Sequence, residues 1–164
     1  MLITPSGGLQ GSNRTDVAEI VATRADEPWY ADAAEALAGL PTASRSEQQM
    51  LWRAIRPLMY GRWDERTQAH AATADTQSSK RAELGYDAAG TEVDVAAIVE
   101  GLQDVTAPVL VIGGDRDAMT GVVAAHAVAA CFPNVRTVVL PRAGHFPWVD
   151  EPAAFAEVVR SFLS

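Results

Sequence analysis

The chain has 164 residues, of which 48% are hydrophobic and 21% charged, a composition that suits one folded domain and argues against wholesale disorder. Its net charge is −8 and no Lys/Arg-rich stretch offsets this charge, so nucleic-acid binding is excluded as a leading function. A single cysteine, Cys131, rules out an internal disulfide framework and fits a reducing compartment. We find no secretory-signal pattern and no membrane-spanning apolar run, so we expect a soluble cytoplasmic protein.

The chain divides into three parts by pattern. Residues 1–13 are an apolar stub followed by a Gly/Ser-rich loop, residues 14–92 are rich in alanine and helical in spacing, and residues 93–164 mix Val-rich runs with helical patterns. The most linker-like stretch is Thr73 to Lys80.

The middle part predicts a series of short amphipathic helices. Ser44 and Glu47 form a capping box, in which the serine accepts a helix N–H and the glutamate reaches back. Four helices are predicted. The first follows the capping pair Thr15-Asp16 and has Val17, Ile20 and Val21 as its apolar face, and the second runs from Glu27-Pro28-Trp29 to Pro41. The third runs from Ser44 to Pro57 with Met50, Leu51, Ala54 and Ile55 as its apolar face, and the fourth runs from Asp64 toward Ala74.

The last part alternates between helices and strands. We predict helices over 93–102, 118–131 and 152–163, and strands over 108–112 and 135–140. The first of these strands is a continuous β-branched run, which is typical of a strand buried on both faces of a parallel sheet. The order helix–strand–helix–strand–helix therefore predicts parallel strands joined by right-handed crossovers.

Two loops leave the carboxyl ends of these predicted strands, where open parallel sheets bind their ligands. The first loop, residues 113–118, contains Asp115 and Asp117, and the second, residues 141–147, contains His145. A carboxylate beside a histidine fixes the tautomer of the imidazole and stabilises the imidazolium formed when the ring accepts a proton. An aspartate that only caps the next helix explains the pattern equally well.

The two loops resemble the C-terminal part of an α/β-hydrolase. Residues 109–117 resemble the family's penultimate core strand with its Gly-x-x-Asp acid, here Gly114 to Asp117. Residues 143–152 resemble the family's histidine loop, a Gly-His pair with an acidic residue five positions and a proline seven positions after the histidine. The opening stretch Leu2 to Gly7 is similar to the strand and loop that follow the family's nucleophile helix, so the resemblance covers essentially the whole chain.

The resemblance implies an α/β fold class: an incomplete α/β-hydrolase fold with about three parallel strands, flanking helices and an inserted helical cap. It divides the chain into a core strand and loop entered midway (1–13), a helical cap (14–92) and the C-terminal part of the core (93–164). In the family's Ser–acid–His triad, Asp117 would orient the imidazole and His145 would be the general base. The Gly-x-x-Asp register selects Asp117, which leaves Asp115 as a turn or cap residue.

The nucleophile of such a triad lies in a Gly-x-Ser-x-Gly elbow, and no serine of the chain has this context. The stretch Gly7 to Gly11 has the glycines but carries Leu9 where the serine belongs. The resemblance places the elbow upstream of Met1, so we expect a C-terminal fragment of a serine hydrolase that is inactive alone. A separate N-terminal half, or self-association through an open sheet edge, would then complete or cover the sheet.

The substrate class follows only from the resemblance. The stretches Glu27 to Tyr30 and Met59 to Trp63 look most like proline-iminopeptidase-type hydrolases, which implies an aminopeptidase or esterase acting on a small-molecule ester, amide or peptide. Asp26 or Glu27 would then bind the amine of the substrate, although solvated surface charges explain both residues as well. A lactone, an epoxide or a carbon–carbon bond as the cleaved group, and a non-catalytic pseudoenzyme or interaction module, stay open as alternatives.

The remaining candidate residues point to no cofactor. Three scattered histidines and one cysteine give no metal-ligand spacing, and the Gly-x-Gly-x-x-Gly pattern of a phosphate-binding loop is not met, so neither a metal nor a cofactor is predicted. His70 is interpreted as a lone surface residue on a polar helix, and Trp148 is expected to pack beneath the histidine loop.

Overall fold

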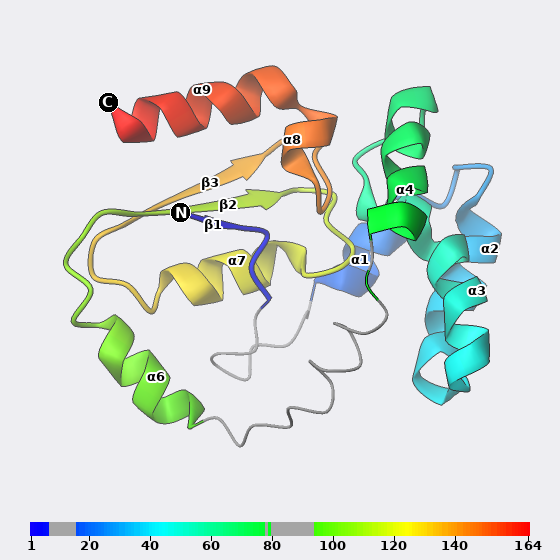
Figure 1. Ribbon diagram of the computed structural model, residues 1–164, viewed down its shortest axis with the longest axis horizontal. Helices are drawn as coiled ribbons and strands as arrows, with labels where there is room; N and C mark the ends of the chain where they lie inside the picture. The colour runs from blue at the N-terminus through cyan, green and yellow to red at the C-terminus, as the bar shows by residue number, and fades with distance from the viewer. Residues whose placement is uncertain (7–15, 78, 80–93) are drawn as a thin grey trace.

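The computed structural model describes residues 1–6, 16–77, 79 and 94–164 (Figure 1). Along the chain the elements are β1 (Leu2–Ile3), α1 (Val17–Ala22), α2 (Tyr30–Gly39), the 3₁₀ turn η2 (Leu40–Thr42), α3 (Arg45–Ile55), the 3₁₀ turn η3 (Arg56–Met59), α4 (Glu65–Gln77), α6 (Val95–Leu102), β2 (Val109–Gly114), α7 (Gly121–Ala129), β3 (Val135–Leu140), α8 (Pro147–Asp150) and α9 (Pro152–Leu163). The predicted loop over 7–13, the capping role of Thr15 and the cap boundaries at 14 and 92 lie outside the described residues.

The three strands form one parallel sheet in the order β1-β2-β3, which confirms the predicted parallel sheet. In the pairing of β1 with β2, Leu2 lies opposite Val111. The pairing of β2 with β3 runs from Val109 opposite Val135 to Gly114 opposite Leu140. Parallel strands need a crossover connection, and α7 lies in the connection between β2 and β3. All three strands therefore end at one edge of the sheet, where the candidate site lies.

Helices cover both faces of β2, which explains its continuous apolar sequence. Leu110 and Ile112 point to one face, where they pack with Phe155 of α9. Val111 points to the other face, where it packs with Ala125 of α7. Figure 1 shows α9 and α7 on opposite sides of the sheet. Each fully buried aliphatic side chain of this kind contributes about 1.5–3 kcal/mol to folding.

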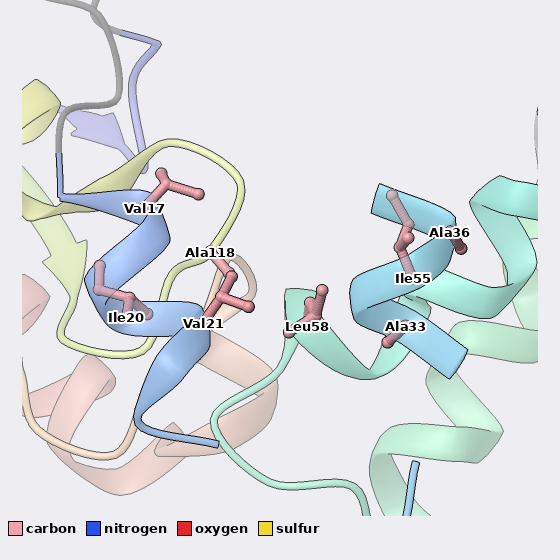
Figure 2. Close-up of a cluster of buried hydrophobic side chains, with 8 residues drawn as sticks. All are labelled: Val17, Ile20, Val21, Ala33, Ala36, Ile55, Leu58 and Ala118. Carbon is pink, nitrogen blue, oxygen red and sulfur yellow. The ribbon is translucent and has the colours of Figure 1, made fainter. Parts of the chain in front are cut away.

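Helices α1 to α4 lie beside the sheet, and an apolar cluster on the loop after β2 is one of their contacts with the core (Figures 1 and 2). Its buried members are Val17, Ile20, Val21, Ala33, Ala36, Ile55, Leu58 and Ala118. In Figure 2, Ala118, from the loop after β2, lies next to Val21 of α1, while Leu58 of η3 faces the α2–α3 side. The cluster therefore packs the helical region onto the loop that carries Asp117.

Two predicted boundaries in the helical region are wrong. The linker-like stretch that begins at Thr73 is helical as far as Gln77, the last residue of α4. The helix predicted from Glu27 begins at Tyr30, and Pro41 lies within η2, which continues the helix as a 3₁₀ turn. Proline is tolerated at this position because the N–H of a residue in the first turn of a helix has no hydrogen-bond acceptor within that helix.

The capping box before α3 is confirmed. The Glu47 N–H donates to Ser44 Oγ over 3.4 Å, and the Ser44 N–H donates to Glu47 Oε2 over 2.8 Å. The apolar stripe predicted to follow it is only partly right, because Ile55 is fully buried while Met50 is exposed.

Asp16 caps a different helix from the one predicted. Its side chain makes no capping bond to α1, which it precedes. Instead, Asp16 Oδ2 accepts the N–H groups of Val122 (2.8 Å) and Val123 (3.1 Å) in the first turn of α7. Gly121, at φ 80°, allows this approach, since a Cβ there would lie 2.2 Å from Asp16 Oδ1. The helix predicted from residue 118 accordingly begins at Gly121.

Candidate active site

The loop after β2 is held tightly against the loop after β3. A Cβ at Gly114, the last residue of β2, would lie 2.2 Å from the carbonyl oxygen of Ala143, so only glycine permits this approach. Two residues later, the Arg116 N–H donates to the same carbonyl oxygen over 2.9 Å. These contacts fix the main chain on either side of Asp115 and set the position of Asp117.

The Asp117 carboxylate is 1% exposed and both of its oxygens accept hydrogen bonds. Oδ1 accepts from the N–H groups of Met119 (2.8 Å) and Thr120 (3.1 Å), and Oδ2 accepts from Thr120 Oγ1 (2.6 Å) and lies 3.1 Å from His145 Nδ1. Burial by itself raises the pKa of Asp117, but the hydrogen bonds from His145, Thr120 and Met119 outweigh it and the pKa lies below its ordinary value. The carboxylate is therefore ionised at neutral pH.

His145 is fixed through both its main chain and its ring. Its N–H donates to the Met59 carbonyl oxygen (2.8 Å), and its own carbonyl oxygen accepts from Thr4 Oγ1 (3.2 Å). The loop enters this position through Arg142, at φ 60°. With a proton on Nδ1 donated to Asp117, Nε2 of the partly exposed ring is the nitrogen that accepts a proton.

The structure brings Asp117 and His145 together and leaves Asp115 apart. The exposed Asp115 side chain has no hydrogen bond or ion pair with any described residue. Asp117 also serves as the local cap that the alternative interpretation expected, since it accepts two N–H groups from the turn before α7. Capping and pairing with His145 are thus combined in one carboxylate, and the catalytic role stays a prediction.

A second buried carboxylate, Asp150, lies close to His145 and was given no role by the sequence. It is 0% exposed, and its Oδ2 accepts the N–H groups of Gly61 (2.9 Å) and Gly144 (2.8 Å). Burial raises the pKa of Asp150, and these two hydrogen bonds only partly offset the effect. The acidic residue five positions after His145 was the available signal, but its partner Gly61 is 89 residues away.

Two aromatic predictions are corrected. His70 is not a lone surface residue, because it is partly buried and its Nδ1 lies 2.7 Å from the Tyr60 hydroxyl. Burial, together with the nearby charge of Asp150, raises the pKa of Tyr60 to about 12. Trp148 is exposed and meets the edge of Phe146, with ring centroids 5.5 Å apart, so it flanks the histidine loop and does not lie beneath it.

A polar cavity of about 410 Å³ lies between the end of α1 and the loop after β2. It is lined by Thr23, Arg24, Asp26, Glu27, Asp115 and Arg116. Arg24 is buried and donates to Glu27 Oε1 (3.2 Å) and to the Tyr60 carbonyl oxygen (3.0 Å). Asp26 and Asp115 have no ion pair within the described part of the chain, and Arg116 lines the same cavity.

The described residues offer no site for a metal ion, since no three His, Cys, Asp or Glu side chains among them are suitably grouped. Within the same residues, no helix combines the length and the apolar character needed to cross a membrane.

Comparison with known proteins places this geometry in a family. Residues 3–158 match the family model of the α/β-hydrolase family, and the chain belongs to that family. Among curated proteins, the uncharacterized protein Rv2715 of Mycobacterium tuberculosis is 36% identical over 56 residues, which cover 34% of this chain and 16% of that protein. The chain thus spans only a small part of the curated relatives it matches.

Solved structures show the same fold. The 2-hydroxy-6-oxo-6-phenylhexa-2,4-dienoate hydrolase from Rhodococcus sp. strain RHA1 is similar with a TM-score of 0.60 and 12% identity, over 99% of this chain and 53% of that chain. Est816, an N-acyl homoserine lactone degrading enzyme, has a TM-score of 0.51 and 23% identity over 96% and 54% of the two chains. The esterase RhEst1 from Rhodococcus sp. ECU1013 has a TM-score of 0.50 and 21% identity over 80% and 47%. The chain spans about half the length of these proteins, and the likeness confirms the predicted α/β-hydrolase fold class.

Proposed function

We propose that Asp117 and His145 are the acid and the general base of a Ser–Asp–His triad in a hydrolase that cleaves small-molecule esters or amides. The observation that carries the proposal is the 3.1 Å contact between His145 Nδ1 and Asp117 Oδ2, made by a carboxylate that is buried, ionised and held by three further hydrogen bonds. Membership of the α/β-hydrolase family supports it.

The chemistry follows from this pair. His145 Nε2 takes the proton of the nucleophile's hydroxyl as its oxygen attacks the substrate carbonyl, and the ring then gives that proton to the leaving group. Water then attacks the carbonyl of the acyl-enzyme and loses a proton to Nε2. The bond between the acyl group and the nucleophile breaks, the acid product leaves, and Nε2 returns the proton to the nucleophile's oxygen. Asp117 keeps the ring in the required tautomer and stabilises the imidazolium in both steps.

We place the nucleophile and the oxyanion donors outside these 164 residues, since none of the serines lies in a Gly-x-Ser-x-Gly elbow. Within the described residues, β1 pairs only with β2, so the other edge of β1 is free to pair with a further strand. We propose that the part of the enzyme carrying the elbow pairs there. The 164-residue chain alone is then expected to show no hydrolase activity.

Complementation tests the proposal. The chain is produced together with a polypeptide that carries the elbow, identified in the sequence upstream of Met1 or in a separate gene, and hydrolysis of a p-nitrophenyl ester is measured. His145→Ala and Asp117→Asn are expected to lower kcat about 10⁴-fold. Asp115→Asn is the matched control, two residues away, and should retain activity toward this uncharged ester. Turnover by the unaccompanied chain that His145→Ala abolishes would contradict the placement of the nucleophile, and full activity of Asp117→Asn would contradict the triad.

An aminopeptidase is the second candidate, supported by the polar cavity. Asp26 and Asp115 line it without an ion pair to any described residue and offer charge to a protonated substrate amine. In the complemented enzyme, Asp26→Asn would then raise KM for an amino-acid anilide about tenfold and leave KM for an uncharged ester unchanged. Equal turnover of free and N-acetylated anilides would favour the esterase.

A further inference from the structure

We propose that Asp150 is a positioning residue for His145, which it holds by clamping the segment Met59–Gly61 to the histidine loop. The inference rests on the proposed role of His145 as the general base. Asp150 ends α8 and has a fully buried side chain. Its Oδ2 accepts hydrogen bonds from Gly144, the residue before His145, and from Gly61, in a segment 89 residues away along the chain.

The two clamped segments meet backbone to backbone. A Cβ at Gly61 would lie 1.8 Å from the Arg142 carbonyl oxygen, and a Cβ at Gly144 would lie 2.5 Å from the Met59 carbonyl oxygen. The His145 N–H donates to that same Met59 oxygen over 2.8 Å. The main chain of His145 is thus tied to the segment directly, and the residue before it is tied through Asp150.

Stability alone does not account for a carboxylate at this place. Among the described residues, nothing donates a hydrogen bond to Asp150 Oδ1, although that atom is buried. The nearby guanidinium of Arg62 donates to the main-chain carbonyl oxygen of Asp150. A buried carboxylate with one unpartnered oxygen costs free energy of folding. Asp150 accepts a hydrogen bond from Gly144, the residue directly before His145. A costly buried acceptor at this place is consistent with a need to hold a catalytic group in a precise position.

The contact between His145 and Asp117 depends on that placement. At 3.1 Å the Nδ1–Oδ2 hydrogen bond already lies toward the long end of the normal range, so a main-chain shift of about 1 Å at His145 would break it. Asp117 is held by its own loop and would not follow the histidine. Loss of the clamp therefore separates the pair.

A pair of variants with the same side-chain shape tests the clamp. Asp150→Asn keeps an oxygen that accepts both N–H groups, whereas Asp150→Leu fills the same space without an acceptor. The readout is the ¹H–¹⁵N NMR signal of the His145 Nδ1–H in the labelled full chain, which reports the hydrogen bond to Asp117. We expect Asp150→Asn to retain the downfield signal and Asp150→Leu to lose it. Glu151→Gln, which alters the neighbouring carboxylate, should leave the signal unchanged.

An unchanged His145 signal in folded Asp150→Leu overturns the proposal. If that variant does not fold, hydrogen exchange in the unmodified chain decides: the Gly61 and Gly144 amides should exchange about 100-fold more slowly than exposed amides, and unprotected exchange overturns the clamp. Neither readout requires substrate turnover. Inactivity of the complemented enzyme therefore refutes the proposed function without affecting this test, whereas a signal retained in folded Asp150→Leu refutes the clamp without affecting the triad.

Discussion

Asp117 and Asp150 are both buried and both lie close to His145, yet they are held in opposite ways. Asp117 has four hydrogen bonds distributed over its two oxygens, and three of these bonds come from its own loop. Asp150 has two, both on one oxygen, from main-chain groups of two separate segments. One carboxylate is organised locally, and the other joins parts of the chain that are distant in sequence.

The difference shows what decides the ionisation of a buried carboxylate. Burial is the largest influence on both residues and raises both pKa values. For Asp117 the hydrogen bonds outweigh burial and the pKa is lowered; for Asp150 they do not and the pKa is raised. For Asp117, the additional hydrogen bonds and the charge of His145 turn the rise caused by burial into a fall in pKa.

The largest effect on the free energy of unfolding is expected from Gly61→Ala, which adds a side chain to the segment that Asp150 binds. The new Cβ would meet the Arg142 carbonyl oxygen at 1.8 Å, and a backbone atom cannot rotate away as a side chain can. We expect a loss of about 3 kcal/mol or more in the free energy of unfolding, measured by urea titration of the full chain. The Asp117 carboxylate should keep its hydrogen bonds from Met119 and Thr120, because neither donor lies in this segment.

Gly101→Ala is the matched control for that prediction. A Cβ at Gly101, within α6, would meet nothing within 4 Å. Alanine favours the helix over glycine, so the free energy of unfolding should stay equal or rise by up to about 1 kcal/mol. Similar losses from both substitutions would show that the close contact at Gly61 does not exist.

The second-largest effect on the free energy of unfolding is expected from replacing each of the two aspartates with alanine. Asp117→Ala leaves two N–H groups and a hydroxyl unpaired and should cost about 2–4 kcal/mol at pH 7. Asp150→Ala leaves two N–H groups unpaired but also removes a charge that burial disfavours, so it should cost less, about 1–2 kcal/mol. Both losses are measured by urea unfolding. A larger loss at Asp150 would contradict the argument from the number of donors.

The third expected effect is that the contributions of Asp117 and Asp150 to stability change with pH in opposite directions. The pKa of Asp117 is lowered by folding, so its stabilisation is present above the unfolded pKa, near 3.9, and is lost as the pH falls through the folded pKa. The pKa of Asp150 is raised, so its contribution is fully present below the unfolded pKa and is lost as the pH rises through the folded pKa. A tenfold difference in proton affinity between the folded and unfolded states corresponds to about 1.4 kcal/mol.

Asparagine variants at the two positions measure this directly. Relative to the unmodified chain, Asp117→Asn should have a lower free energy of unfolding at pH 7, and the loss should shrink below about pH 3.9. The free energy of unfolding of Asp150→Asn, relative to the unmodified chain, should be higher at pH 7 than at pH 4. Urea midpoints at several pH values provide the comparison. Parallel pH profiles for the two variants would mean that the two carboxylates do not differ as described.

The sequence predicts those parts of the molecule whose signals are local. The strand over 135–140 and the helix over 152–163 match the structure residue for residue, because a Val-rich run marks the strand and an N-terminal proline marks the helix. Asp117 and His145 could be paired because parallel strands end at the same edge of a sheet, so the loops that follow them meet.

Contacts between distant segments are what the sequence does not show. The clamp of Asp150 depends on Gly61, and a glycine carries no side chain whose pattern could indicate a partner. His70 looks like a surface residue until Tyr60 is placed against it. Asp16 precedes α1, and local rules assign it to that helix, whereas tertiary packing presents it to α7. For Asp150 and Asp16, the bonded partner belongs to a segment about 90 to 106 residues away in sequence.

The smallest effect is expected at Glu151, the residue after Asp150. Its carboxylate lies 3.2 Å from Arg142 Nε, and this partner is 67% exposed, so water and salt screen the pair. Glu151→Ala should therefore change the free energy of unfolding by less than about 1 kcal/mol, and about 1 M NaCl should remove most of the difference. Asp150→Ala, one position earlier, should keep its loss in salt because its partners are buried main-chain groups. Equal salt sensitivity at the two positions would show that adjacent carboxylates are held alike, and the contrast between a buried acceptor and a surface ion pair would fail.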